Sequence, residues 1–135
     1  FLAIPMAPIE TISEKDVSKY FDANTFLTQR LIKLIHPLLK KQKDSIAVFI
    51  SDNTKKKNKK FLGIHNAIQA ANKEIVMSYS EETLRIGPKV LLFEPLPMPT
   101  KTRSIMFPGE NKKKLSSCKE EANKLIKLLI DNIKN

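Results

Sequence analysis

The sequence has no tryptophan, one cysteine, two histidines and three glycines in 135 residues. The single cysteine, Cys118, excludes an intrachain disulfide and favours a reducing compartment, so we expect an intracellular protein of the cytoplasm or nucleus. No apolar run approaches the roughly 18 residues that a membrane-spanning helix needs, which argues against integral membrane association. Gly63, Gly87 and Gly109 are isolated, so neither a phosphate-binding loop nor a dinucleotide-binding fingerprint is present. The sequence therefore predicts no cofactor.

Few side chains are available for catalysis or metal binding. Two distant histidines and one cysteine do not supply the three or four closely spaced ligands that a metal site needs. His36 falls on the polar face of a predicted helix, which favours a solvated surface histidine. His65 lies beside apolar residues in another predicted helix, which favours a structural role, and Cys118 lies on an apolar stripe, where cysteine usually acts as a small hydrophobic residue. The sequence therefore predicts no catalytic residue and no metal site.

Lysine is what the sequence has in excess. Twenty-four Lys and Arg residues against 14 Asp and Glu give a formal net charge of +10 and a pI near 9.7. A field of this sign favours polyanions such as nucleic acid or an anionic membrane surface. Three clusters concentrate the charge and provide the candidate nucleic-acid-binding residues: Lys40, Lys41 and Lys43; Lys55, Lys56, Lys57, Lys59 and Lys60; and Lys112, Lys113 and Lys114.

The kind of basic residue indicates how such binding would work. Lysine is a mobile point charge, whereas arginine makes the planar bidentate contacts that read bases and phosphates. Only three arginines, Arg30, Arg85 and Arg103, are present. We therefore expect contacts with the phosphate backbone that are salt-sensitive and weakly sequence-specific. The alternative is that the clusters are solvated loops of a lysine-rich protein.

The chain begins with an apolar leader, residues 1–10, in which Pro5 and Pro8 favour an extended backbone. The leader has neither a basic region nor a small-residue cleavage site, so it is a poor signal peptide. Either Met6 is the native start and residues 1–5 are foreign to the natural protein, or the chain is a fragment. Residues 11–135 have the size of a single domain, and alternating prolines at 94–100 predict a stiff extended connector within it.

The first half of this domain shows two helices and a strand. Ser13, followed by Asp16, can cap a short helix that runs to about residue 21, and Asn24 or Thr25 can cap the next. An apolar stripe of helical period follows, with Pro37 either kinking the helix or ending it at residue 35 or 36. Residues 45–51 read as a buried strand. The stripe consists of Leu27, Leu31, Leu34, Ile35 and Leu38.

The second half is expected to alternate between helix and strand. We predict a short helix over 61–72, strands over 74–80 and 84–93, and a short strand at 105–107. Ser117 and Glu120 form a capping box that begins a long C-terminal helix. The order predicts an α+β fold, with a small sheet of three or four strands packed with amphipathic helices. The apolar face predicted for the last helix comprises Cys118, Ala122, Leu125, Ile126, Leu129 and Ile133.

The plan of a leading helix, strands joined by a basic loop and a closing amphipathic helix resembles the small RNA-binding proteins of the signal recognition particle Alu domain. Residues 26–49 carry this resemblance, which covers less than half of the chain. The sequence thus predicts a non-catalytic, basic RNA-binding subunit of a ribonucleoprotein. One alternative is an assembly or adaptor subunit that binds a protein partner through its apolar helix and proline-rich surfaces. A second is a small enzyme that uses His65 or Cys118.

Overall fold

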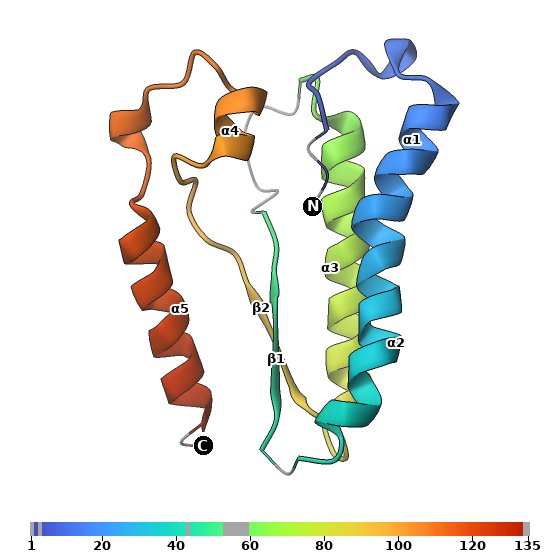
Figure 1. Ribbon diagram of the computed structural model, residues 1–135, viewed down its shortest axis with the longest axis vertical. Helices are drawn as coiled ribbons and strands as arrows, with labels where there is room; N and C mark the ends of the chain where they lie inside the picture. Colours follow the sequence, from blue (N-terminus) through green and yellow to red (C-terminus); the bar gives the residue numbers. More distant parts are fainter. Residues whose placement is uncertain (1, 3, 43, 53–59, 134–135) are drawn as a thin grey trace.

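The computed structural model describes residues 2, 4–42, 44–52 and 60–133. In this part of the chain, helices pack around a small parallel sheet (Figure 1). The elements in chain order are α1 (Glu14–Phe21), α2 (Leu27–Leu39), β1 (Ile46–Ile50), α3 (Gly63–Thr83), β2 (Lys89–Phe93), α4 (Lys101–Met106) and α5 (Cys118–Ile133), with short 3-10 turns at Ile9–Thr11 and Lys112–Lys114.

A β1–α3–β2 unit forms the centre of the molecule. The two strands are parallel, with Ile46 opposite Lys89 and Ile50 opposite Phe93. Parallel neighbours need a long crossover connection, and α3 supplies it. Both strands are short apolar runs, IAVFI and KVLLF, of the kind that parallel sheets bury. The expected α+β class with a small sheet and a long C-terminal helix is confirmed, and the sheet has two strands among the described residues.

The strand predicted over 74–80 is wrong, because these residues lie inside α3. A short apolar run such as Ile75–Met77 fits a buried strand or a helix equally well when it is taken alone. Burial over a longer stretch separates the two, because buried Val76 beside exposed Met77 fits either structure. The buried positions of the whole segment recur with helical spacing: His65, Ile68, Gln69, Val76, Tyr79 and Thr83.

The first two helices form one continuous helical segment. Ser13 caps α1 as expected, since its hydroxyl accepts from the amide of Asp16 at 3.1 Å. Neither Asn24 nor Thr25 caps α2, because both lie in a π-helical turn, Asp22–Phe26, that joins α1 to α2. α2 continues through Pro37 to Leu39, so the alternative ending at residue 35 or 36 is wrong.

Asn24 instead ties the leader to this turn. Its side chain accepts from the amide of Leu2 at 2.8 Å and donates to the carbonyl of Leu2 at 3.2 Å. Further along, the amide of Ala7 donates to the carbonyl of Phe61 at 3.1 Å. Between these contacts Ile4 is 1% exposed and is among the most buried side chains of the protein. The leader therefore packs against the helices in the structure.

The connector and α4 follow β2. Residues 94–100 contain neither helix nor strand, as the prolines predict. The strand predicted at 105–107 is wrong, because Lys101–Met106 form α4. Thr100 begins this helix, since its hydroxyl accepts from the amide of Arg103 at 3.2 Å. A threonine directly before the first helical residue is a strong N-cap, and it decides between helix and strand here.

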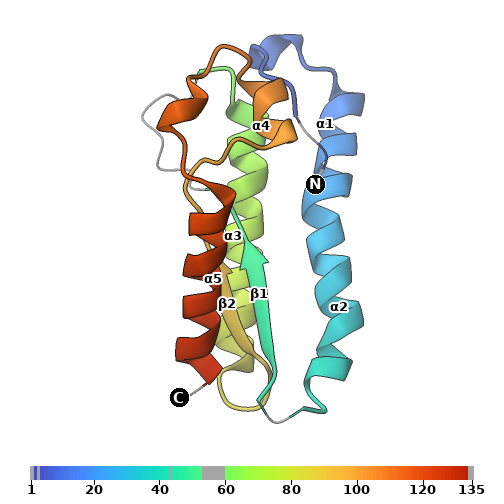
Figure 2. The same ribbon diagram turned by 60° about the vertical axis from the view of Figure 1, so that its left-hand side comes forward.

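α5 lies on the opposite side of the strands from α2 in both views (Figures 1 and 2). Its capping box is confirmed: Ser117 donates through its amide to Glu120 at 2.9 Å, and its hydroxyl accepts from the Glu120 amide at 3.1 Å. Most of the predicted apolar face is wrong: Leu125 and Leu129 are half-buried, whereas the other four residues are exposed, namely Cys118, Ala122, Ile126 and Ile133. The buried residue of α5 is instead Glu121, which accepts from the amide of Leu96 at 3.0 Å. This hydrogen bond attaches α5 to the connector.

No helix in the part of the chain that the structure describes combines the length and the apolar character needed to cross a membrane.

Candidate functional site

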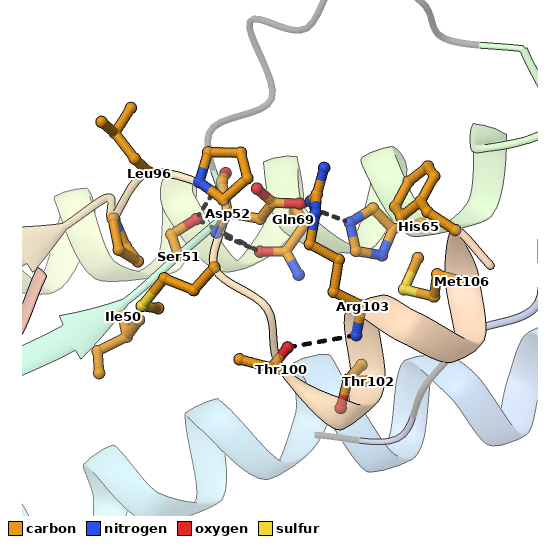
Figure 3. A pocket seen from close by; sticks show the side chains of 14 residues that line it. Ile50, Ser51, Asp52, His65, Gln69, Leu96, Thr100, Thr102, Arg103 and Met106 are labelled. Carbon is orange, nitrogen blue, oxygen red and sulfur yellow. Dashed lines mark hydrogen bonds and ion pairs between the residues drawn. The ribbon is translucent and has the colours of Figure 1, made fainter. Parts of the chain in front are cut away.

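A cavity of about 390 Å³ lies where the carboxyl ends of both strands meet α3 and α4 (Figure 3). Residues directly after β1 form one side, the N-terminal half of α3 forms the floor, and the connector with α4 forms the other side. Its lining residues are Ile50, Ser51, Asp52, His65, Gln69, Pro95, Leu96, Pro97, Met98, Thr100, Thr102, Arg103, Met106 and Phe107.

His65, which is buried, and Asp52, which is partly exposed, form an acid–base pair at this cavity. His65 is on the first turn of α3 and is 7% exposed. Its Nε2 lies 3.2 Å from Oδ2 of Asp52, which follows β1. A carboxylate against one ring nitrogen fixes the orientation and tautomer of the imidazole. The pair therefore has the arrangement of a group that can hold and transfer a proton.

Gln69 positions Asp52. It lies one helical turn beyond His65, so both side chains project from the same face of α3. Its Oε1 accepts from the hydroxyl of Ser51 at 3.3 Å and from the amide of Asp52 at 3.2 Å. These two bonds attach the end of β1 to α3 and hold the carboxylate beside the imidazole, as Figure 3 shows.

Arg103 of α4 extends over the cavity from the opposite side (Figure 3). Its Nε and Nη2 donate to the two carboxylate oxygens of Glu110, each at 2.5 Å. Its guanidinium also lies over the ring of Phe107, with 4.7 Å between the guanidinium carbon and the ring centroid. A bidentate pair that is also stacked holds the guanidinium in one place.

The described lysines of the predicted clusters do not line this cavity. Lys40 and Lys41 follow α2 near the start of β1, whereas Lys112–Lys114 form a turn before α5 at the opposite end of the molecule (Figure 1). Lys60 is exposed, and its Nζ lies 5.9 Å from the ring centroid of Phe61. Lys43, Lys55, Lys56, Lys57 and Lys59 lie outside the described residues.

His36 and Cys118 differ from their predicted environments. His36 is half-buried and its Nδ1 lies 3.0 Å from the hydroxyl of Tyr79, so it is not simply a solvated surface residue. Burial, and then the charge of Glu82, raises the pKa of Tyr79. Cys118 is exposed at the start of α5, outside the cavity. No group of three or more His, Cys, Asp or Glu among residues 2, 4–42, 44–52 and 60–133 is arranged to hold a metal ion.

Sequence reasoning missed Asp52, Gln69 and Arg103 as site residues. A signal for Asp52 was present, because it directly follows a predicted apolar strand, and ligands of parallel sheets bind beyond the carboxyl ends of the strands. Gln69 is spaced four residues from His65, which places both on one helical face. No local pattern indicates that Arg103 lies opposite them.

No protein-family profile and no curated protein matches the sequence. Solved structures nevertheless share its fold. A short-chain dehydrogenase from Escherichia coli CFT073, solved in complex with NADPH, is 20% identical, with a TM-score of 0.81 over 98% of this chain and 53% of its own. The E. coli oxidoreductase yciK is 22% identical, with a TM-score of 0.76 over 86% of this chain and 47% of its own. A short-chain dehydrogenase from Salmonella enterica serovar Typhi CT18 is 21% identical, with a TM-score of 0.77 over 86% of this chain and 48% of its own.

The chain thus has the fold of about half of these dehydrogenases and spans about half of their length. This finding overturns the prediction of a non-catalytic RNA-binding subunit of a ribonucleoprotein, because the solved structures reported above are oxidoreductases. It also overturns the expectation of RNA or another polyanion as the partner, since one of these structures holds NADPH. The clustering of lysine was a misleading signal, because net charge reports on the field of a protein and not on its fold.

Proposed function

We propose that this chain carries the active site of an oxidoreductase that uses a nicotinamide dinucleotide. The active site is the cavity at the carboxyl ends of the strands. The observation that carries the proposal is the position of the His65–Asp52 pair. It lies beyond the carboxyl ends of two parallel strands, where open α/β sheets bind their ligands. The likeness to a dehydrogenase that holds NADPH supports it. The intracellular location expected from the sequence is part of the same proposal.

The cavity fits the nicotinamide end of such a cofactor. Apolar side chains suit the faces of an uncharged ring, and the polar groups of Thr100 and Thr102 suit its carboxamide. The pyrophosphate end needs a glycine-rich turn before a helix, and the three glycines of this sequence are isolated. We therefore assign only the nicotinamide end to these residues. When bound, the cofactor supplies or accepts a hydride.

In this proposal the residues of this chain supply or accept the proton of the reaction. Reduction of a carbonyl requires a hydride on carbon and a proton on oxygen, and oxidation of an alcohol releases both. We assign the proton to the pair of His65 Nε2 and Asp52 Oδ2, which are 3.2 Å apart. Gln69 keeps Asp52 in place, and Met106 and Phe107 supply apolar surface in the same cavity.

Ligand binding and turnover test the proposal separately. NADPH, the reduced nicotinamide mononucleotide and adenosine bisphosphate are titrated into the isotopically labelled chain, and the amide signals of residues 51, 52, 65 and 69 are followed by NMR. We expect NADPH and the mononucleotide to shift these signals and adenosine bisphosphate to leave them unchanged. Shifts with adenosine bisphosphate alone, or no shift with any of the three, would overturn the assignment.

Turnover is measured as the loss of NADPH absorbance with carbonyl compounds. We expect His65→Ala to lower kcat about 100-fold or more, the contribution typical of a positioned proton donor. His36→Ala is the matched control, because His36 lies in a different part of the structure, against Tyr79, and should retain wild-type turnover. Equal rates for both variants would remove His65 from the chemistry.

A further inference from the structure

The cavity contains one permanent cation among its described lining residues, and that cation is already neutralised. Arg103 is 16% exposed and Glu110 is 28% exposed at their side chains, so the pair is largely shielded from water. The guanidinium donates through two nitrogens to both oxygens of one carboxylate. The spacing of two guanidinium N–H groups matches the two oxygens of a carboxylate, so this pair fixes the position of the guanidinium. The stack on Phe107 restrains the guanidinium further.

Apart from Thr100, Thr102 and Arg103 itself, the connector and α4 contribute apolar side chains to the cavity. Leu96 and Met98 come from the connector, and Met106, which is buried, comes from α4. Methionine side chains adapt to irregular apolar shapes, so this wall can accommodate a hydrocarbon group without a fixed outline. His65 and Asp52 face the same cavity, with Met106 drawn beside His65 (Figure 3).

Glu110 already occupies Nε and Nη2 of Arg103 and cancels the charge of the guanidinium. A ligand carboxylate at the remaining guanidinium N–H groups would lie beside the Glu110 carboxylate, and like charges close together in a shielded site oppose binding. An uncharged ligand meets no such penalty, because it leaves the Arg103–Glu110 pair intact.

We infer that the substrate is an uncharged carbonyl compound or alcohol with an apolar chain, and that Glu110 determines this selectivity. This inference rests on the proposed function. The reacting oxygen lies toward His65 and Asp52, and the chain lies along Met98 and Met106. Glu110 acts through Arg103, so it is a positioning residue that sets the charge the cavity accepts.

A pair of probes of equal chain length tests the inference by binding alone: a medium-chain methyl ketone and the corresponding carboxylate, each titrated by NMR into the 135-residue chain. We expect the wild-type chain to prefer the ketone. Glu110→Gln removes the neutralising charge and frees Arg103, so carboxylate affinity should rise roughly tenfold or more. Ketone affinity should change less than about threefold, because its contacts are with the apolar wall.

Two further variants keep the result interpretable. Glu74→Gln removes one carboxylate from the exposed surface of α3 and should change neither affinity, which controls for net charge. Arg103→Met combined with Glu110→Gln should abolish the gain in carboxylate affinity, because the freed guanidinium is its cause. Circular dichroism confirms that each variant is folded.

Three results would overturn the inference: equal wild-type affinity for both probes, an unchanged preference in Glu110→Gln, or binding of neither probe. The proposed function fails separately, if the ketone binds but NADPH neither binds nor is oxidised in its presence.

Discussion

Replacing Gln69 with leucine tests whether the site is assembled as described. Leucine has a similar size but no acceptor, so the amide of Asp52 and the hydroxyl of Ser51 both lose the bonds now made at 3.2 and 3.3 Å. Gln69 is 6% exposed, so water cannot easily replace its carbonyl. The variant therefore separates the end of β1 from α3 without creating a cavity.

The magnitude follows from these two groups. A backbone amide left without an acceptor costs about 1–3 kcal/mol, and the loss of an ordinary hydroxyl hydrogen bond costs about 0.5–1.5 kcal/mol. The hydroxyl of Ser51 retains a weak contact with the carbonyl of Asp52 at 3.4 Å, so its share is at the lower end. Burying the leucine offsets roughly 1 kcal/mol. We expect a net loss of about 0.5–2.5 kcal/mol in the free energy of unfolding.

Urea unfolding measures this loss, and amide hydrogen exchange locates it. In Gln69→Leu the amide of Asp52 should exchange faster by a larger factor than amides elsewhere in α3, because its own bond is gone. Gln29→Leu, on the exposed surface of α2, is the matched control and should change stability by less than about 0.5 kcal/mol. A loss no larger than that of the control, with unchanged exchange at Asp52, would show that Gln69 does not hold the site together.

Three further changes have definite expectations. Ile4→Ala should lower the free energy of unfolding by about 2–5 kcal/mol, because Ile4 is 1% exposed. Ile9→Ala in the same leader should lower it by less than about 1 kcal/mol, because Ile9 is 65% exposed. Urea unfolding compares the two variants, and equal losses would contradict the packing of the leader. Ser117→Ala removes the α5 cap and should cost about 1 kcal/mol, measured by thermal unfolding, and an unchanged Tm would rule the cap out as a stabilising contact. The hydrogen bond from Lys124, followed by that from Ser116, lowers the pKa of Glu121 from 4.5 to about 2. The resulting stabilisation of the folded state is complete above about pH 4.5 and is lost as the pH falls toward 2. Glu121→Gln should therefore make the free energy of unfolding less dependent on pH between these values, and an unchanged slope would refute this expectation.

Local signals predicted local structure well. The start of α5 follows from Ser117 and Glu120, which lie within four residues of one another and satisfy each other's backbone amides. The start of α1 follows from Ser13 in the same way. The strand β1 was predicted because an apolar run of this length between polar segments has few other structures open to it.

The failures concern features that depend on distant residues. Residues 74–80 became helical because α3 began at Gly63 and continued through them, and nothing within the short run could reveal this. The cavity brings Asp52, His65 and Arg103 together from three elements, so no sequence window contains the site. Lysines, in contrast, are conspicuous in the sequence because they need no tertiary contact to cluster there, and for that reason their clustering said little about the site.

The sheet described above has a practical consequence for work with the purified chain. Among the described residues β1 bonds to β2 alone, so the peptide groups along its outer border have no strand beside them. An edge strand of this kind can pair with extended segments of other molecules, and the apolar run IAVFI has no charged residue or proline to prevent such pairing. Titrations should therefore be repeated at several protein concentrations, so that association of the chain with itself is not mistaken for binding of a small molecule.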